Sequence, residues 1–313
     1  MTTNPLHADL MSLAPQWHCS ARYLQWQAES SPSLASALHA LSMAFENDAT
    51  PLTLQAPAPF IQSLANLGIA LQISINNTCI DIPPYLFWQY PNNWLPQALP
   101  PLPLHYQISD GRRHPLRRAQ GHGVVYQRHI PWLQQSLSFR VADIDIDLPH
   151  FHRWMNDPHV AEFWQESGSE DDHHRYLEKV TLDAHSTPLI ACLDDVPFGY
   201  FEVYWAKEDR IAPFYDVADF DRGWHVLIGE AAYRGKDFVS AWLPSISHYL
   251  FLDDCRTQRI VIEPRTDNQK MRSNLQRSGY ALIKEFDFPH KRAVLGSLLR
   301  ERFFAEQLWL PTL

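Results

Sequence analysis

The segment from His225 to Phe238 constrains the fold of this chain more than any other part of the sequence. Val226-Leu227-Ile228 predicts a buried strand, because β-branched and aliphatic side chains suit a pleated, half-buried surface. An Arg234-Gly235-Lys236 turn follows, and a helical pattern begins at Val239. A glycine turn before a helix predicts an anion site, because the first N–H groups of the helix lack internal partners and its dipole favours a phosphate.

His225 stands at the head of this predicted strand, on the same strand–turn–helix unit as the anion site. An imidazole titrates near neutral pH, so His225 is a candidate general base. Its alternative role is that of a strand-edge histidine bonded to a neighbouring carbonyl group. A phosphate site beside a candidate base predicts group transfer from a phosphate-bearing carrier.

A second strand–helix unit follows along the chain. Ile260–Ile262 predicts a strand that ends at a proline. Asp267 or Asn268 can cap the next helix, and Gly279 can end that helix in a left-handed turn.

The order of strand, Arg-Gly-Lys turn, helix, strand, Asn-initiated helix and Gly-aromatic exit resembles the acyl-CoA-dependent N-acyltransferases of the GNAT superfamily. Within that superfamily, several segments resemble the hydroxylamine acetyltransferases of hydroxamate siderophore biosynthesis, the aerobactin type. These segments are Ser138–Asp143, Arg153–Pro158, Phe201–Trp205, Glu263–Asn268 and Lys284–Arg292. The resemblance is dense from Ser138 to Phe304 and weaker before Ser138.

The resemblance implies an α+β protein with the GNAT acyltransferase fold, in which helices flank a mixed central sheet, and an additional N-terminal α/β region. We predict an accessory region over residues 1–136 and a catalytic domain over residues 137–313. The elements predicted in the catalytic domain are a first strand at Phe139–Ala142, paired helices at Pro149–Asn156 and Glu170–Leu182, and a hairpin of Ile190–Leu193 with Tyr200–Trp205.

The accessory region has its own patterns. Leu34–Met43 carries apolar residues at helical spacing, and Ile69–Ile75 alternates as a strand does. Asp110–Arg118 holds four arginines, which either face an anion or form a solvated linker. The possibility that this region is a degenerate acyltransferase-like domain stays open.

The resemblance also implies acetyl-CoA as co-substrate and no metal. Asn268 resembles the asparagine that contacts the pantetheine arm in this superfamily. The residues expected to bind the donor are Val226, Leu227, Ile228, Arg234, Gly235, Lys236, Asp237, Phe238 and Asn268.

Two residues are predicted to be catalytic, His225 and Asp267. Asp267 follows the neighbouring strand, where it can orient the imidazole or simply cap a helix. The acceptor groove is expected to be lined by Glu202, Tyr204, Trp205 and Trp164. Glu202 and Tyr204 should point together, because alternate residues of a strand share a face. A carboxylate there could bind the distal cation of a diamine or an amino acid.

The sequence departs from the superfamily pattern at three positions. Ala232 and Asp237 stand at the first and last positions of the anion-binding turn, so only Gly235 is retained. Leu275 stands where many relatives carry a tyrosine that protonates the leaving thiolate. The proton donor to that thiolate therefore stays unassigned.

Composition narrows the class of protein. A net charge of −9 without a basic stripe argues against nucleic-acid binding. The four cysteines have no Cys-x-x-Cys spacing, and His150-Phe-His152 and His173-His174 lack the spacing of a helical metal pair. The N-terminus resembles no signal peptide and no apolar run is long enough to span a membrane, so a cytoplasmic location is the expectation.

The resemblance to the hydroxylamine acetyltransferases implies transfer of an acetyl group from acetyl-CoA to N-hydroxylysine, N-hydroxyputrescine or N-hydroxycadaverine, which yields a hydroxamate. The chain is also expected to associate with other enzymes of siderophore synthesis. The alternatives are acylation of another amine, such as an aminoglycoside or polyamine, use of succinyl-CoA, and a non-catalytic acyl-CoA-binding module.

Overall fold

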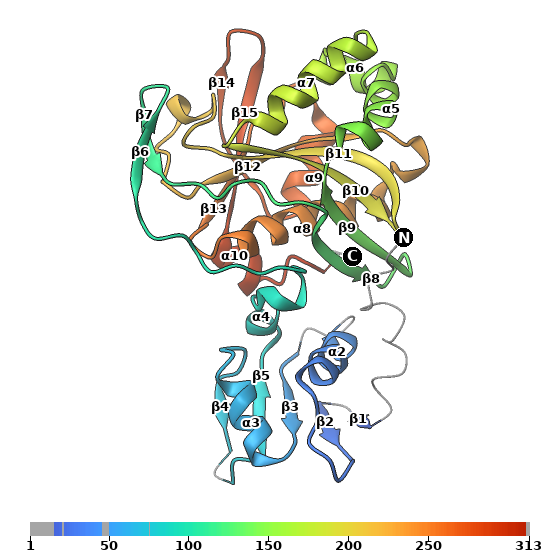
Figure 1. Ribbon diagram of the computed structural model, residues 1–313, viewed down its shortest axis with the longest axis vertical. Coiled ribbons are helices and arrows are strands. Elements are labelled where there is room, and N and C mark those ends of the chain that lie inside the picture. Colours follow the sequence, from blue (N-terminus) through green and yellow to red (C-terminus); the bar gives the residue numbers. More distant parts are fainter. Residues whose placement is uncertain (1–15, 21, 46–49, 75, 311–313) are drawn as a thin grey trace. The chain divides into compact units, whose positions relative to one another are not determined.

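The computed structural model describes residues 16–20, 22–45, 50–74 and 76–310, and it omits the side chains of residues 72 and 73 (Figure 1). The chain divides into two compact units, residues 1–93 and 94–313, which are described separately here. The predicted division at residues 136 and 137 stays a prediction. Contacts nevertheless group residues 94–136 with the C-terminal unit.

The first unit is built on a five-stranded sheet in the order β1-β2-β3-β5-β4. Its strands are β1 (Trp17–Ser20), β2 (Tyr23–Trp26), β3 (Leu52–Gln55), β4 (Gln72–Ile73) and β5 (Cys79–Ile82). Its helices are α2 (Leu34–Phe45), α3 (Ala58–Ala65), α4 (Pro84–Phe87) and the short 3₁₀ turn η1 (Pro91–Asn93). Helix α2 confirms the helical spacing of its sequence, and it buries Leu38, Leu41 and Phe45. The strand predicted at Ile69–Ile75 is shorter than expected, and Ile75 lies outside the described residues.

The second unit is built on an eight-stranded sheet in the order β14-β15-β13-β12-β11-β10-β9-β8. Its strands are β8 (Val124–Ile130), β9 (Gln135–Val141), β10 (Ser186–Leu193), β11 (Val196–Trp205), β12 (Arg222–Ile228), β13 (Arg259–Ile262), β14 (Ala281–Asp287) and β15 (Arg292–Leu299). Strands β6 (Tyr106–Ser109) and β7 (Arg112–Pro115) form a separate ribbon. The mixed sheet confirms the predicted α+β architecture.

One pair of strands in this sheet is parallel, β12 with β13. The two strands pair only where Arg222 lies opposite Ile260 and Gly223 opposite Val261, although β12 continues to Ile228. Beyond Gly223 the facing edge of β12 has no strand partner among the described residues. Backbone groups beyond Gly223 therefore bind side chains in place of a strand: the carbonyls of Val226 and Ile228 accept hydrogen bonds from Trp164 and Arg234.

Helices cover both faces of the sheet. Figure 1 shows α5 (Ile144–Met155), α6 (Pro158–Trp164) and α7 (Glu170–Leu182) above it, and α8 (Lys236–Asp253) below it. Phe151 of α5 packs on Tyr200 at 4.7 Å between ring centroids, whereas Trp242 of α8 packs on Phe201 at 5.7 Å. Adjacent residues of β11 thus face opposite layers. The remaining helical segments are η2 (Ala212–Phe214), η3 (Ala231–Tyr233), α9 (Gln269–Arg277) and α10 (Arg300–Ala305).

Several local predictions are confirmed. Helix α7 spans Glu170–Leu182 as expected, and its capping box at Ser169 and Asp172 explains where it begins. The side chain of Asn268 caps α9 by accepting a hydrogen bond from the backbone of Met271, and Gly279 follows α9 with a φ of 87°. No helix in the described part of the chain is long and apolar enough to cross a membrane.

Candidate active site

His225 lies between two carboxylates. Its Nε2 is 2.8 Å from Oε1 of Glu263, and its Nδ1 is 3.5 Å from Oε2 of Glu202. The His225 side chain is 22% exposed, so one part of the ring still faces solvent. This geometry suits an imidazole that exchanges protons with a bound substrate.

Glu263 is the most constrained member of this group. Its side chain is fully buried, and Oε2 accepts a hydrogen bond of 2.8 Å from the hydroxyl of Tyr204. Lys291 Nζ donates to the backbone carbonyl of Glu263 at 2.8 Å and lies 3.6 Å from Oε1. Gly223 makes room for Tyr204, because a Cβ at that position would lie 2.2 Å from the ring.

The two carboxylates determine the charge of His225. Burial alone would lower its pKa, but the negative charge of Glu263 and hydrogen bonds to Glu202 and Glu263 outweigh burial and raise the pKa to about 9. Burial alone would raise the pKa of Glu263, and the positive charge of His225 lowers it instead. At neutral pH the pair is therefore an imidazolium beside a carboxylate.

Glu202 is held from helix α7 as well as from its own strand. The hydroxyls of Tyr176 and Tyr200 donate to Oε1 of Glu202 at 2.6 and 2.9 Å. Glu202 and Tyr204 both reach the His225–Glu263 pair, so they share a face of β11 as the strand period predicts.

Asp267 lies apart from this group. Its side chain is 62% exposed, and its oxygens accept hydrogen bonds of 3.0 and 2.6 Å from Arg265. Among the described residues, no hydrogen bond or ion pair joins Asp267 to His225. Glu263 occupies the position beside the imidazole that the sequence had suggested for Asp267.

Sequence reasoning missed Glu263, although strand register could have located it. In the parallel pairing of β12 with β13, Arg222 lies opposite Ile260. Three residues further along both strands, the same register places His225 opposite Glu263, the first residue after β13. The pairing of β12 with β13 was not known from the sequence, so this register could not be counted. The available signal was a charged residue directly after a short aliphatic strand.

The two tryptophans predicted to line the acceptor groove lie on different faces. Trp164 donates from Nε1 to the backbone carbonyl of Val226 at 3.0 Å, and its ring meets His225 edge-on at 6.4 Å between centroids. Trp205 lies between the guanidinium groups of Arg117 and Arg222. The Cζ atoms of these arginines are 4.0 and 4.1 Å from the centroid of the Trp205 ring. The structure thus brings Trp164, and not Trp205, to His225.

The predicted donor turn follows β12. Gly235 has a φ of 143°, which a residue with a side chain rarely adopts, and it begins helix α8. Arg234 is folded back, because its guanidinium donates to the carbonyls of Ile228 and Gly229 and to Asp157. Arg234 therefore closes the turn in this state instead of facing an anion.

A pocket of about 300 Å³ opens between α8 and α9 beside this turn. Gly235 and Lys236 line it from α8, and Lys270, Asn274 and Arg277 line it from α9. The side chains from α9 were not predicted. Lysine and arginine beside the N-terminus of a helix suit the phosphate groups of a carrier such as coenzyme A.

Three other predicted donor residues do not line this pocket. Asp237 is exposed, Phe238 packs against Tyr233 with 5.3 Å between ring centroids, and Asn268 caps α9. Leu275, at the position of the missing tyrosine, is fully buried. It offers no proton to a leaving thiolate.

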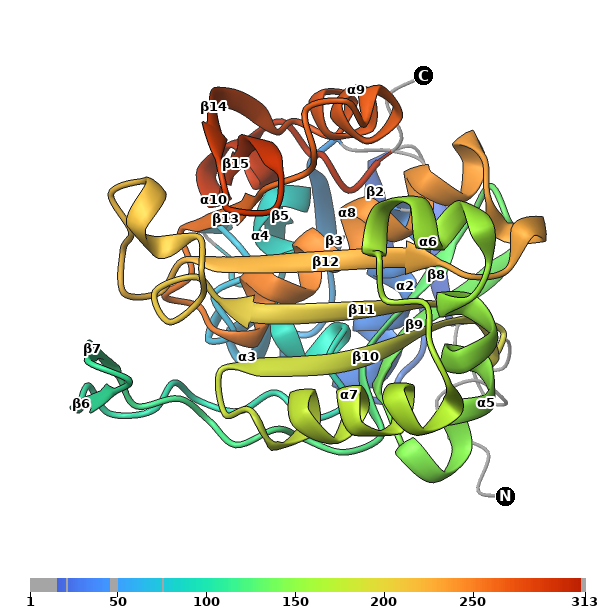
Figure 2. The same ribbon diagram turned by 90° about the horizontal axis from the view of Figure 1, so that it is seen from above.

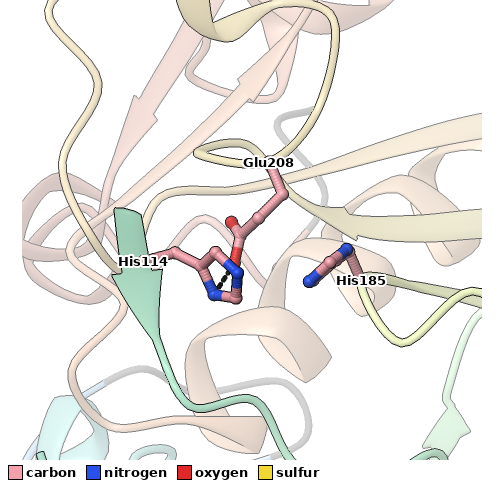
Figure 3. Close-up of side chains that lie close together, drawn as sticks. All are labelled: His114, His185 and Glu208. Atoms are coloured by element: carbon pink, nitrogen blue, oxygen red, sulfur yellow. Dashed lines mark ion pairs between the residues drawn. The ribbon is translucent and has the colours of Figure 1, made fainter. Parts of the chain in front are cut away.

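One cluster away from His225 has the residue types of a metal site. Figure 3 shows His114, His185 and Glu208 close together, with Nδ1 of His114 2.8 Å from Glu208. The buried Nε2 of His114 has no hydrogen-bond partner among the described residues, which favours a ligand. Arg117, however, pairs with both oxygens of Glu208 at 2.6 and 2.9 Å, and its positive charge opposes a bound cation. The absence of a metal stays a prediction.

Comparisons with known proteins identify related chains. Residues 143–288 match the family model described as an acetyltransferase (GNAT) domain. The chain is 48% identical over 192 residues to the N(6)-hydroxylysine O-acetyltransferase of Escherichia coli. The aligned residues make up 61% of this chain and 61% of that protein. It is 38% identical over 221 residues to a hydroxyornithine transacylase of Ajellomyces capsulatus. This alignment covers 67% of this chain and 50% of that protein.

A solved structure resembles much of the chain. An uncharacterized protein of Bacillus halodurans matches with a TM-score of 0.57 and 30% identity, over 61% of this chain and 96% of that protein. The chain spans 61% and 50% of the lengths of the two curated relatives, which is less than two thirds in both cases.

Proposed function

From the match of residues 143–288 to the acetyltransferase (GNAT) domain, we propose that the chain transfers an acetyl group from acetyl-CoA to an N-hydroxylated amine to make a hydroxamate. The candidate acceptors are N-hydroxylysine, N-hydroxyputrescine and N-hydroxycadaverine. The observation that carries the proposal is His225, held by Glu263 and Glu202 on the part of β12 that has no second strand partner among the described residues. The names of the two curated relatives support an N-hydroxylated acceptor.

The donor fits the end of β12 that leads into α8. Lys236, Lys270 and Arg277 line the pocket beside Gly235 and would hold the phosphates of coenzyme A. The open edge of β12 runs from that turn back to His225, so a thioester lying along it would reach the imidazole. Val226 presents its carbonyl on that edge, where Trp164 now donates to it.

The reaction forms an N–C bond and breaks the C–S bond of the thioester. The hydroxylamine nitrogen loses a proton as it attacks, and the departing thiolate gains one. A hydroxylamine is mostly neutral at pH 7, so it needs less help from a base than an alkylammonium does.

The charge state of His225 favours a particular division of roles. With a pKa of about 9, the imidazole carries a proton at pH 7 and can donate it to the thiolate, a task for which buried Leu275 has no group. The proton released by the nucleophile can then restore the imidazolium, because the pKa values of the Glu263 and Glu202 carboxylates are lowered and these groups bind a proton less readily than the imidazole does. We therefore propose that His225 and Glu263 act as one proton-transfer pair, in place of His225 as a neutral base assisted by Asp267.

The test is a panel of three hydroxylamines and their parent amines, each with acetyl-CoA and with succinyl-CoA. Release of free thiol measures turnover, and product mass identifies the acyl group. A coloured complex with iron(III) separates a hydroxamate, acylated on nitrogen, from an O-acyl product. Thiol release that depends on a hydroxylamine and yields a hydroxamate supports the proposal.

The same panel separates the alternatives. Preference for a parent amine or an aminoglycoside would indicate a general amine acyltransferase. Preference for succinyl-CoA would identify succinyl-CoA, and not acetyl-CoA, as the acyl donor. Absence of thiol release with every acceptor would favour a non-catalytic acyl-CoA-binding module. The cytoplasmic location and any association with other enzymes of siderophore synthesis remain predictions.

A further inference from the structure

We propose that Arg210 binds a carboxylate of the acceptor, so that the preferred acceptor is an N-hydroxylated amino acid and not a diamine. This inference rests on the proposed function, because it assigns the substrate class of the same site. N-hydroxycadaverine is N6-hydroxylysine without its carboxylate, so the two acceptors test that single group.

The loop that carries Arg210 is held in place, whereas the Arg210 guanidinium has few partners. It follows β11 in a loop fixed by the fully buried Ile211, whose backbone N–H is bound by Asp209 at 2.9 Å. The Arg210 side chain is 49% exposed and lies 3.6 Å from Oε1 of Glu263. Among the described residues it makes no hydrogen bond, so its N–H donors remain available to a ligand.

Glu263 does not need Arg210 as a partner. Its two oxygens already meet Nε2 of His225 and the hydroxyl of Tyr204, each at 2.8 Å, and Lys291 lies at 3.6 Å. A fourth group that is half exposed and beyond hydrogen-bond distance adds little to that cluster. Its orientation is better explained by a second anion that binds when the acceptor is present.

Lys291 and His290 lie beside Arg210. Arg210 and Lys291 lie over the ring of Phe288, at 5.7 and 5.4 Å from its centroid, and His290 stacks on that ring at 5.5 Å. Burial, together with the charges of Arg210 and Lys291, lowers the pKa of His290. Two cations, Arg210 and Lys291, thus lie beside the pair of His225 and Glu263, and the carboxylate of Asp209 lies in the same cluster.

The spacing suits the length of the acceptor. Contacts of 2.8 and 3.6 Å lead from His225 Nε2 through Glu263 Oε1 to the Arg210 guanidinium. In an extended N6-hydroxylysine the nitrogen and the carboxylate are separated by roughly 7 Å, given standard bond lengths. One molecule can therefore place its nitrogen beside His225 and its carboxylate at Arg210.

A carboxylate could also come from a dicarboxylic acyl donor such as succinyl-CoA, but the strand order favours the acceptor. Because β11 and β12 are antiparallel, with Trp205 opposite Arg222, the loop that carries Arg210 lies at the start of β12. The donor turn at Gly235 follows the other end of β12. Figure 2 shows the β11–β12 loop and the segment after β12 at opposite ends of the sheet.

The experiment compares kcat/KM for N6-hydroxylysine and N-hydroxycadaverine in the wild type, Arg210→Gln and Arg210→Lys. The wild type should prefer N6-hydroxylysine, and Arg210→Gln should lower that preference roughly ten- to hundredfold, the range expected for charge-assisted hydrogen bonds. Arg210→Lys should recover part of the preference, because it keeps the charge but not the forked geometry. Arg175→Gln is the control, since Arg175 is an exposed residue of α7 paired with Asp172, and it should leave the preference unchanged.

Other outcomes overturn the inference. An equal loss with both acceptors would make Arg210 a structural partner of Glu263, and a wild type that does not prefer N6-hydroxylysine would remove the carboxylate site. If Arg210→Gln lowers kcat/KM with succinyl-CoA but not with acetyl-CoA, Arg210 binds a carboxylate of the donor. In these cases hydroxamate formation still stands, whereas failure with every hydroxylamine removes the proposed function and this inference together.

Discussion

The two ends of β12 differ in how the sequence encodes them. The donor end is one continuous segment, in which Arg234-Gly235-Lys236 follows the strand and starts α8. At the other end, residues from separate parts of the chain meet: Arg210 after β11, Glu263 after β13 and Lys291 before β15. A local motif can be read from a sequence, but a charge cluster assembled by strand order cannot.

The largest effect expected at the acceptor end is discrimination between a hydroxylamine and its parent amine. An alkylammonium has a pKa of about 10.4, and each pH unit below that value costs about 1.4 kcal/mol before it can attack. At pH 7 this amounts to roughly a thousandfold disadvantage for lysine or putrescine. We expect kcat/KM ratios of that order, narrowing as pH rises toward 10. Equal rates at pH 7 would contradict the assignment of a hydroxylamine acceptor.

The next largest effect concerns His225, which lies between the two ends. His225→Ala should lower kcat by about 10² to 10⁴, the range for a positioned proton-transfer group, and nearer the lower limit because a hydroxylamine needs little base catalysis. Unchanged turnover between pH 6 and 9 would leave His225 a structural role only. Gln107→Ala, on the separate β6–β7 ribbon, serves as control.

The pH profile decides which form of His225 is active. The folded pKa of about 9 lies above the ordinary value of 6.5, so the imidazolium is present at neutral pH. The stability that it contributes is complete below about pH 6.5 and is lost progressively as pH rises to about 9. We expect kcat/KM to fall above about pH 9, and Glu263→Gln to move that decline to lower pH. A rise in kcat/KM toward pH 9 would instead identify neutral His225 as the base.

The sequence predicted those structural features that depend on residues close together in the chain. Helix α7, the cap at Asn268 and the left-handed exit at Gly279 follow from local rules, and each is present. Glu263 was missed because its contact with His225 depends on the register of β12 with β13. Trp205 was assigned to the acceptor groove, but the strand period turns it to the face opposite Tyr204.

A moderate effect is expected at the donor end. Gly235→Val puts a branched residue where φ is 143°, and it places a side chain where backbone should meet phosphate. The KM for acetyl-CoA should rise about tenfold, equivalent to roughly 1.4 kcal/mol, while the KM for the hydroxylamine changes much less. Steady-state kinetics with each substrate varied in turn measures both constants.

Gly111→Val provides a matched control for that change. Gly111 also has a positive φ, of 75°, and a Cβ there would contact nothing within 4 Å, as at Gly235. It lies in the turn of the β6–β7 ribbon, away from the pocket beside α8. If both variants raise the donor KM equally, backbone strain and not phosphate binding explains the effect.

The smallest effect separates the neighbouring residues Asp267 and Asn268. Asn268→Ala removes the cap of α9 and should cost about 1 kcal/mol, or roughly 2–4 °C in Tm for a unit of this size, and Asn268→Asp should retain the cap. Asp267→Ala should leave Tm and kcat unchanged, because its carboxylate is exposed and pairs with Arg265 at the surface. Thermal unfolding and turnover of the three variants test this. A large loss of kcat in Asp267→Ala would return that residue to the catalytic group, whereas a raised donor KM in Asn268→Asp at normal Tm would show that Asn268 contacts pantetheine.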